Sequence, residues 1–169
     1  MPLSPRDLPL SLYIHIPWCV RKCPYCDFNS HASDGDIPEP GFVAKLLADL
    51  EQDLPLCGDR QLTSIFIGGG TPSLLSGQAI RTLLDGVRKR IDWQSDIEIT
   101  LEANPGTAEA GRFADFRQAG VNRLSIGVQS FNAGHLQALG RIHGPDNHHR
   151  HSGVSARRPT VAPIVWRSA

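Results

Sequence analysis

Three cysteines lie within eight residues near the start of the chain, at Cys19, Cys23 and Cys26. Thiolates at the spacing Cys-x3-Cys-x2-Cys are soft ligands that suit a transition metal or an iron–sulfur cluster. A tetrahedral zinc site needs four ligands and an ordinary cubane cluster needs four cysteines, so three cysteines leave one position open. We therefore expect a metal centre with a free corner. A zinc site completed by His15 or His31 is the alternative interpretation.

The residues around these cysteines favour a cluster over a single zinc ion. Trp18, Tyr25 and Phe28 are expected to pack around the cysteines, and apolar shielding of this kind protects a cluster and tunes its potential. Cys57 stands apart from the other three. We expect it to be a small packed or surface thiol without a chemical role.

A glycine-rich stretch, Gly68-Gly69-Gly70-Thr71-Pro72, is the second candidate site. Glycines allow backbone N–H and C=O groups to approach a ligand with no Cβ in the way, and such polar backbone can bind a charged group. A flexible turn is the alternative interpretation. No Gly-Lys-Ser/Thr sequence follows, so the stretch is not a phosphate-binding P-loop.

Three further polar residues are weaker candidates when each is considered alone. Glu102 is either a solvated charge at a strand end or a carboxylate that accepts hydrogen bonds from a ribose diol or an amine. Gln129 is a strand-end amide by its local sequence, and Arg141 is a cation at a helix end. Whether these three residues form one site depends on the strands and helices that position them.

Hydrophobic spacing predicts an alternation of strands and helices. We expect strands at residues 10–16, 63–67, 97–103 and 123–128, and helices at residues 43–54, 80–91 and 108–119, with a fourth helix that begins near Leu136. The first helix should be stopped by Pro55 and Gly58, and Thr107 and Gly120 should cap the third. Without hairpin signals, this order predicts a parallel α/β sheet. Each candidate site then follows a strand, at the edge where such folds build active sites.

Composition limits the class of protein. The 169 residues include 17 Lys and Arg and 17 Asp and Glu, a balance that gives no overall attraction to nucleic acid, and none is predicted as a partner. Residues 61–80 carry no charge, but the glycine stretch interrupts them, so no transmembrane segment is predicted. No signal peptide precedes residue 10. We therefore predict a cytoplasmic, reducing location, in which clustered cysteines bind metals.

Domain organisation follows from these patterns. Residues 1–9 are expected to be an N-terminal extension and residues 10–146 a folded domain. Residues 147–169 contain neither an Asp nor a Glu and lack apolar periodicity, so we expect an aberrant tail without regular structure. The tail is too short for another strand–helix unit of about 30 residues. A shifted reading frame or truncation after about Asp146 would explain it, and this predicts weak folding and little or no turnover.

The segment Cys19-x3-Cys23-x-Tyr25-Cys26 resembles the signature of the radical S-adenosylmethionine (SAM) enzymes. The resemblance implies a partial (β/α)6 barrel resembling a TIM barrel, of which this chain holds about four βα units. It also implies that the three cysteines bind a [4Fe–4S] cluster whose fourth iron is chelated by SAM. An electron passed to the bound sulfonium then produces methionine and a 5′-deoxyadenosyl radical.

Later motifs resemble one branch of that superfamily, the oxygen-independent coproporphyrinogen III oxidase family. This resemblance implies that the SAM pocket is lined by Tyr13, Gly69, Gly70, Thr71, Glu102, Gln129 and Arg141. The oxidase usually has a further cysteine two positions after the third ligand, where this chain has Phe28. The chain is therefore more similar to the heme chaperones of the branch.

The resemblance also implies partners. These are heme or a porphyrinogen, an electron donor, and apoproteins that accept heme. Oxidative decarboxylation of coproporphyrinogen III is the alternative function of the same family. A plain iron–sulfur or zinc-binding module without SAM, or an inactive fragment, is the alternative of another class.

Overall fold

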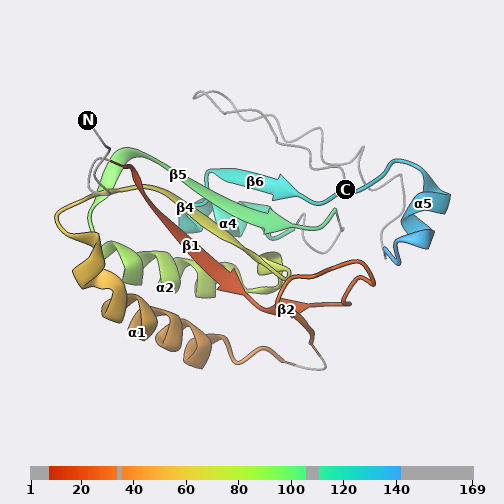
Figure 1. The fold of residues 1–169 in the computed structure, drawn as a ribbon, viewed down its shortest axis with the longest axis horizontal. Coiled ribbons are helices and arrows are strands. Elements are labelled where there is room, and N and C mark those ends of the chain that lie inside the picture. The colour runs from red at the N-terminus through yellow and green to blue at the C-terminus, as the bar shows by residue number, and fades with distance from the viewer. Residues whose placement is uncertain (1–7, 34–35, 106–110, 142–169) are drawn as a thin grey trace.

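The computed structural model describes residues 8–33, 36–105 and 111–141. The predicted tail at residues 147–169, most of the predicted N-terminal extension and the predicted cap Thr107 lie outside these residues. Figure 1 shows an open sheet with helices packed along it.

Four strands form the main sheet, in the order β1-β4-β5-β6. They are β1 (Leu10–Ile16), β4 (Leu62–Gly69), β5 (Trp93–Ala103) and β6 (Arg123–Ile126). All three neighbouring pairs are parallel, as the absence of hairpin signals predicts. The carboxyl ends of the four strands therefore lie along one edge of the sheet, on the right of Figure 1.

Helices α1 (Glu39–Cys57), α2 (Gly77–Arg88) and α4 (Phe113–Ala119) supply the apolar layer against this sheet. α2 packs between α1 and α4. Side chains alternate along a strand, so Ile14 and Ile16 of β1 enter the core between sheet and helices, whereas Tyr13 and His15 lie on the other face. The predicted alternation of the first strand is confirmed.

The first helix stops at Gly58 as predicted, since α1 ends at Cys57 and Gly58 is its C-cap, but Pro55 lies inside the helix and does not end it. Proline removes one hydrogen-bond donor, but the last carbonyl groups of the helix have another partner. Arg60 donates from Nε to the Cys57 carbonyl at 2.9 Å and from Nη2 to the Leu56 carbonyl at 3.1 Å. The predicted role of Cys57 as a packed thiol is confirmed, since it is half-buried against the core.

Several other boundaries differ from the predicted ones. β5 begins at Trp93, four residues before the predicted start, where Trp93 pairs with Leu62 and the register of the two strands shifts. β6 ends at Ile126, two residues early. The last of the described helices is α5 (Ala133–Ala138), which begins before the predicted Leu136, and Gly120 ends α4 with a φ of 115°, as predicted. A short parallel pair, β2 (Trp18–Cys19) and β3 (His31–Ala32), was not predicted.

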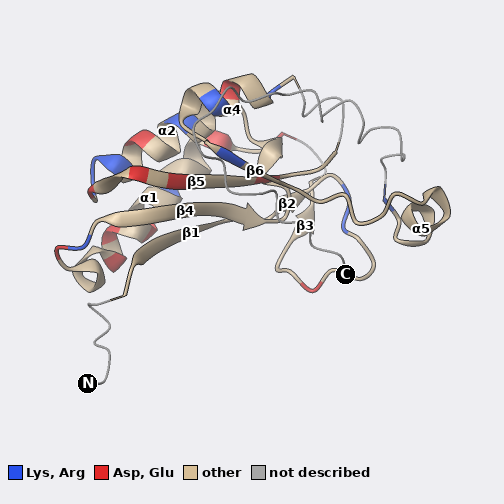
Figure 2. Cartoon of the chain, turned by 90° about the horizontal axis from the view of Figure 1, so that it is seen from above, with Lys and Arg blue, Asp and Glu red and all other residues tan. Residues whose placement is uncertain are grey.

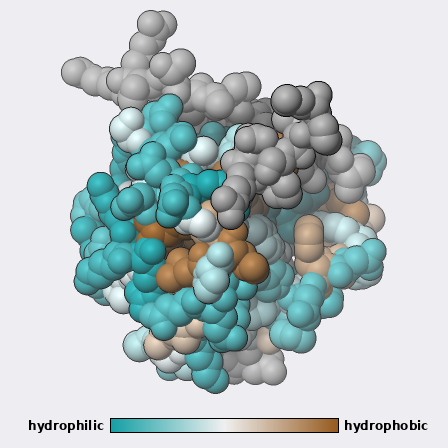
Figure 3. Space-filling view, turned by 60° about the vertical axis from the view of Figure 1, so that its left-hand side comes forward, coloured by the Kyte–Doolittle hydropathy of each residue, from teal (hydrophilic) through white to brown (hydrophobic). Residues whose placement is uncertain are grey.

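On the described part of the chain, the outer surface carries charges of both signs. Figure 2 shows Lys and Arg interspersed with Asp and Glu along the helices, whereas the charged residues of β5 are all acidic. Figure 3 shows the end of the molecule where the strands begin, with brown apolar patches interrupted by hydrophilic side chains. None of the described helices is long and apolar enough to cross a membrane.

Candidate cofactor site

A pocket of about 610 Å³ opens at the carboxyl ends of the strands. It is lined by all ten residues that the sequence assigns to the cluster and SAM, namely Tyr13, Cys19, Cys23, Cys26, Gly69, Gly70, Thr71, Glu102, Gln129 and Arg141. These residues come from β1, β4 and β5 and from the connections that follow β1, β4, β6 and α5. The strand ends therefore lie together as expected, and the predicted residues line a single cavity.

The three cysteines line this pocket from the end of β2, where Cys19 lies, and from the connection between β2 and β3, which holds Cys23 and Cys26. Cys19 is buried, Cys23 and Cys26 are half-buried, and all three are free thiols. Hydrogen bonds hold both ends of the loop, from the Ser33 amide to the Cys19 carbonyl at 2.8 Å and from the His31 amide to the Pro17 carbonyl at 2.7 Å. The loop thus has fixed ends and presents three soft sulfur atoms to one cavity.

Among the described residues, no group of three or more His, Cys, Asp or Glu side chains converges to hold a single metal ion. The alternative zinc site gains no support from its two candidate histidines. Both nitrogen atoms of His15 have partners, in Tyr13 and Asn29, and His31 is exposed. A cluster of several irons holds its cysteines farther apart than a single ion does, so the donor set suits a cluster better.

The predicted aromatic shield forms only in part. The prediction for Trp18 is wrong, because its ring packs edge-on against Phe42 of α1 at 4.4 Å between centroids and belongs to the core. Tyr25 and Phe28 do line the pocket, yet they are 40% and 62% exposed. Trp18 lies two residues after the buried Ile16 and packs on the same, helix-covered side. Of the three predicted aromatic residues, this leaves Tyr25 and Phe28 beside the cysteines.

The glycine turn packs against the backbone that leads into the cysteine loop. A Cβ on Gly70 would lie 2.5 Å from the Trp18 carbonyl oxygen, and Gly69 has a φ of 110° that favours glycine. The Gly70 amide donates to the Ile16 carbonyl and the Thr71 amide to the Trp18 carbonyl, each at 2.7 Å. Glycines are therefore required here by the neighbouring backbone as well as by any ligand.

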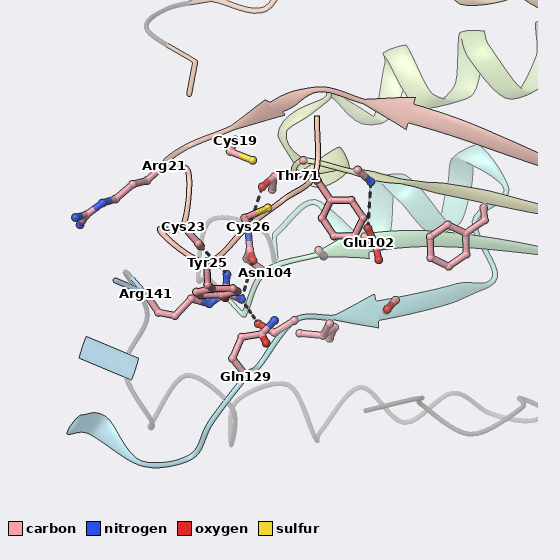
Figure 4. A pocket seen from close by; sticks show the side chains of 18 of the residues that line it. Cys19, Arg21, Cys23, Tyr25, Cys26, Thr71, Glu102, Asn104, Gln129 and Arg141 are labelled. Carbon is pink, nitrogen blue, oxygen red and sulfur yellow. Dashed lines mark hydrogen bonds between the residues drawn. The ribbon is translucent and has the colours of Figure 1, made fainter. Parts of the chain in front are cut away.

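Glu102 lies on the pocket side of β5. Its Oε2 atom accepts a hydrogen bond from the Gly69 amide at 3.2 Å, and a Cβ on Gly68 would approach the same oxygen to 2.9 Å. The carboxylate is half-buried and faces the cavity at the end of the glycine turn (Figure 4). It provides a negative charge for an amine or for hydroxyl groups.

Arg141 reaches back across the pocket from the connection after α5. Its Nη1 donates to Cys23 Sγ at 3.5 Å, and its Nη2 donates to Asn104 Oδ1 at 3.3 Å and to the Gly127 carbonyl. Asn104 in turn donates to Thr71 Oγ1 at 3.2 Å. Figure 4 shows Arg141 beside Tyr25 and Cys23, at the centre of this network.

Gln129 lies after β6 and has a φ of 68°, the one positive value among the described residues other than glycine. Such a backbone conformation costs energy in a residue with a Cβ, and strain of this kind is common at functional sites. The turn directs the Gln129 side chain into the cavity. Gly127 lies beside it, since a Cβ added to Gly127 would lie 3.3 Å from the side-chain amide nitrogen of Gln129.

The pocket also changes the acidity of two phenols. Burial and the Glu102 carboxylate raise the pKa of Tyr13 above its ordinary value of 10.0. Burial likewise raises the pKa of Tyr25, while the Arg141 cation acts in the opposite direction. Tyr13 also stacks on Phe66 of β4, with ring centroids 6.2 Å apart. Both phenols therefore stay protonated at neutral pH.

The sequence analysis missed several residues of this site. Asn104 and Phe66 are the most informative, since Asn104 joins Thr71 to Arg141 and Phe66 supports Tyr13. Phe66 has a signal in the sequence, because it lies one position from the buried Ile65 and Ile67 and so must face the opposite side of the sheet. The other lining residues that were missed are Arg21, Ala103, Arg123, Ser125, Ile126 and Gly127.

Comparison with known proteins agrees with this geometry. The family model of the radical SAM superfamily matches residues 13–150. The heme chaperone HemW of Escherichia coli is 65% identical over 137 residues, which cover 81% of this chain and 36% of that protein. The mitochondrial radical S-adenosyl methionine domain-containing protein 1 of Bos taurus is 42% identical over 140 residues, which cover 83% and 31%.

A solved structure gives the same result for the fold. Coproporphyrinogen III oxidase (HemN) from Escherichia coli, described as a radical SAM enzyme, superposes with a TM-score of 0.75 at 30% identity. The superposition covers 84% of this chain and 33% of the oxidase. The α/β fold is therefore part of a radical SAM barrel, as predicted, and the chain spans about a third of the length of these relatives.

Proposed function

Because this chain belongs to the radical SAM superfamily, we propose that its pocket holds a [4Fe–4S] cluster and SAM for a protein of the heme chaperone kind. The observation that carries the proposal is the convergence of all ten predicted residues on one cavity. Sequence identity supports the heme chaperone over the oxidase, since it is 65% with the former and 30% with the latter.

The residues present fit the two groups. Cys19, Cys23 and Cys26 supply three sulfur ligands, and no fourth cysteine lines the cavity among the described residues. This donor set leaves one iron of a cubane for a different ligand. Arg141 adds a further sign of a missing partner, because its Nε is buried and has no hydrogen-bond partner among the described residues. A buried donor of this kind is costly unless a ligand accepts its hydrogen bond.

When bound, the cluster and SAM would supply one-electron radical chemistry, which is a property of the cofactors. The chain contributes orientation. Glu102 offers a carboxylate for an amine or a ribose diol, and Arg141 offers a cation for a carboxylate. Tyr13, Thr71 and Gln129 offer further polar groups that line the pocket. The glycine turn leaves room for contacts between a ligand and the backbone. These roles are proposals for each residue.

Heme is the proposed cargo, with apoproteins as its acceptors and a separate protein as the electron donor. The support is the similarity to heme chaperones at 65% and 60% identity in two bacterial species. The predicted cytoplasmic location is part of the same proposal.

Anaerobic reconstitution with iron and sulfide tests the cofactors. We expect about four irons and four sulfides per chain, with a broad absorbance that changes when SAM is added. A colourless protein that binds one zinc ion per chain would contradict the proposal. Heme titration, followed by absorbance, then tests the cargo. Conversion of coproporphyrinogen without heme binding would instead support the oxidase.

The variant Glu102→Gln tests the SAM pocket. Removing a charged hydrogen-bond partner costs about 1.5–3 kcal/mol, which is roughly a 10- to 100-fold loss of SAM affinity. Glu51→Gln is the matched control, because Glu51 pairs with Arg90 on the helices and does not line the pocket. We expect Glu51→Gln to bind SAM like the unchanged chain in equilibrium dialysis. Equal SAM affinities in Glu102→Gln, Glu51→Gln and the unchanged chain would show that Glu102 does not contribute to the SAM site.

A further inference from the structure

We propose that Arg141 tunes the reduction potential of the cluster by donating a hydrogen bond to the sulfur of Cys23. This inference rests on the proposed cluster, and it gives Arg141 a role in addition to its predicted contact with SAM. Arg141 then acts as a positioning and tuning residue for the metal centre.

The contact joins two parts of the chain that are far apart in sequence. Arg141 Nη1 lies 3.5 Å from Cys23 Sγ, across a separation of 118 residues. Sulfur accepts hydrogen bonds at longer distances than oxygen does, and a thiolate accepts them more strongly than a thiol. The Tyr25 side chain also hydrogen-bonds with Cys23, but Arg141 brings a positive charge to this proposed cluster ligand.

Other partners fix the guanidinium in this orientation. Nη2 is held by Asn104 Oδ1 at 3.3 Å and by the Gly127 carbonyl. Asn104 is oriented in turn by its donation to Thr71 Oγ1 at 3.2 Å. Thr71 is itself buried, with 5% of its surface exposed. The planar fork of arginine can satisfy these acceptors and Cys23 together, whereas a lysine ammonium cannot do so with the same geometry.

The backbone leaves space for this arrangement at Gly127. A Cβ at Gly127 would lie 3.1 Å from Arg141 Nη2, which is closer than such contacts usually are. Glycine therefore allows the guanidinium to lie against the β6 end while its other nitrogen reaches the cysteine loop. The position of Arg141 thus depends on three segments, which are the strand ends of β5 and β6 and the turn after β4.

A cation that donates to a cysteine sulfur affects reduction of a cluster in a defined direction. Reduction adds negative charge, part of which lies on the sulfur ligands. A hydrogen bond from a positive group stabilises that charge and raises the reduction potential. Removing the donor should therefore make the cluster harder to reduce.

The experiment compares charge-matched variants after anaerobic reconstitution, by spectroelectrochemical titration without SAM. Arg141→Gln should lower the equilibrium constant for one-electron reduction of the cluster about tenfold, which corresponds to a negative shift of the reduction potential by about 59 mV. Arg21→Gln is the control, because it removes the same charge from a pocket-lining residue whose side chain points away from Cys23 (Figure 4). The measured iron and sulfide content per chain shows whether each variant carries the cluster.

A larger negative shift in Arg141→Gln than in Arg21→Gln supports the inference. Equal shifts, or no shift in Arg141→Gln, overturn it. If Arg141→Gln assembles no cluster, Asn104→Ala serves instead, since it keeps the arginine but removes one of the acceptors that orient it. Asn104→Ala should shift the potential in the same direction, and an unchanged potential overturns the inference. Failure of the unchanged chain to assemble a cluster would instead refute the proposed function.

Discussion

Tyr13 shows how one side chain takes its orientation from its neighbours. Its hydroxyl lies 3.0 Å from His15 Nδ1, and His15 Nε2 lies 2.8 Å from the Asn29 carbonyl oxygen. A carbonyl only accepts, so Nε2 carries the proton and Nδ1 of the neutral ring accepts from the Tyr13 hydroxyl. The phenol oxygen then presents lone pairs to the pocket. His15 thus ties the first strand to the cysteine loop at Asn29, three residues after Cys26.

The raised pKa of Tyr13 is measurable because the chain contains two tyrosines. In the Tyr25→Phe variant, absorbance titration of tyrosinate should give a pKa above 10.0, owing to burial and the Glu102 carboxylate. Adding Glu102→Gln should lower that pKa, since it removes the nearby negative charge. A pKa at or below 10.0 in Tyr25→Phe would contradict this environment.

The same shift predicts how stability depends on pH. The folded state binds the phenolic proton more tightly than the unfolded state, whose tyrosine pKa is about 10. Its contribution to the free energy of unfolding is therefore present below about pH 10 and is lost as the pH rises through the folded pKa. Urea denaturation across this pH range should show that the free energy of unfolding declines less steeply with pH in Tyr13→Phe than in the unchanged chain.

At the scale of elements, the start of α2 is held by both local and distant groups. Ser76 Oγ accepts from the Ala79 amide at 3.1 Å and donates to Glu39 Oε2 at 2.6 Å. The Ser76 amide also donates to Glu39 Oε1 at 2.6 Å. One serine therefore caps α2 and joins it to the first turn of α1, just after the glycine turn that lines the pocket.

Ser76→Ala should lower the free energy of unfolding by about 1–2 kcal/mol, because it removes the N-cap and one partner of Glu39. Ser95→Ala is the control, since Ser95 lies exposed on β5, and surface changes of this kind stay within about 0.5 kcal/mol. Chemical denaturation followed by circular dichroism measures both. Equal values for the two variants would show that the cap does not stabilise α2.

At the scale of the whole molecule, the two faces of the sheet have different roles. The face toward the helices is apolar, with Ile65, Ile67, Ile99 and Leu101 at most 2% exposed. The other face carries Tyr13, Phe66, Glu102 and Ser125, which line the pocket. The packed face holds the strand ends in position, so the polar face can bring groups from four strands together.

Phe116 of α4 tests the packed face, because it is 1% exposed and lies in the core. Phe116→Ala should cost about 3–5 kcal/mol of unfolding free energy. Phe131→Ala deletes the same atoms from a side chain that is 61% exposed, and it should change stability by about 0.5 kcal/mol or less. If the two variants unfold at the same denaturant concentration, α4 does not belong to the cooperative core.

The sequence by itself determined the features that depend on local spacing. The period of apolar residues predicts the four strands of the main sheet and the helices, since a buried face must recur every two or about 3.6 residues. The cysteine spacing and the strand-end positions predict which residues meet, because parallel strands end at one edge. Thr71, Glu102 and Gln129 line one pocket for this reason.

Only the tertiary structure decided which of these groups contact each other. Arg141 bonds to Cys23 and Asn104, although nothing in the residues next to Arg141 indicates these contacts. The contact of Trp18 with Phe42 of α1 likewise joins residues far apart in sequence. Such contacts depend on strand register, on loop geometry and on which side chain fills the available space. Those quantities are set by residues far apart in sequence, and no local period encodes them.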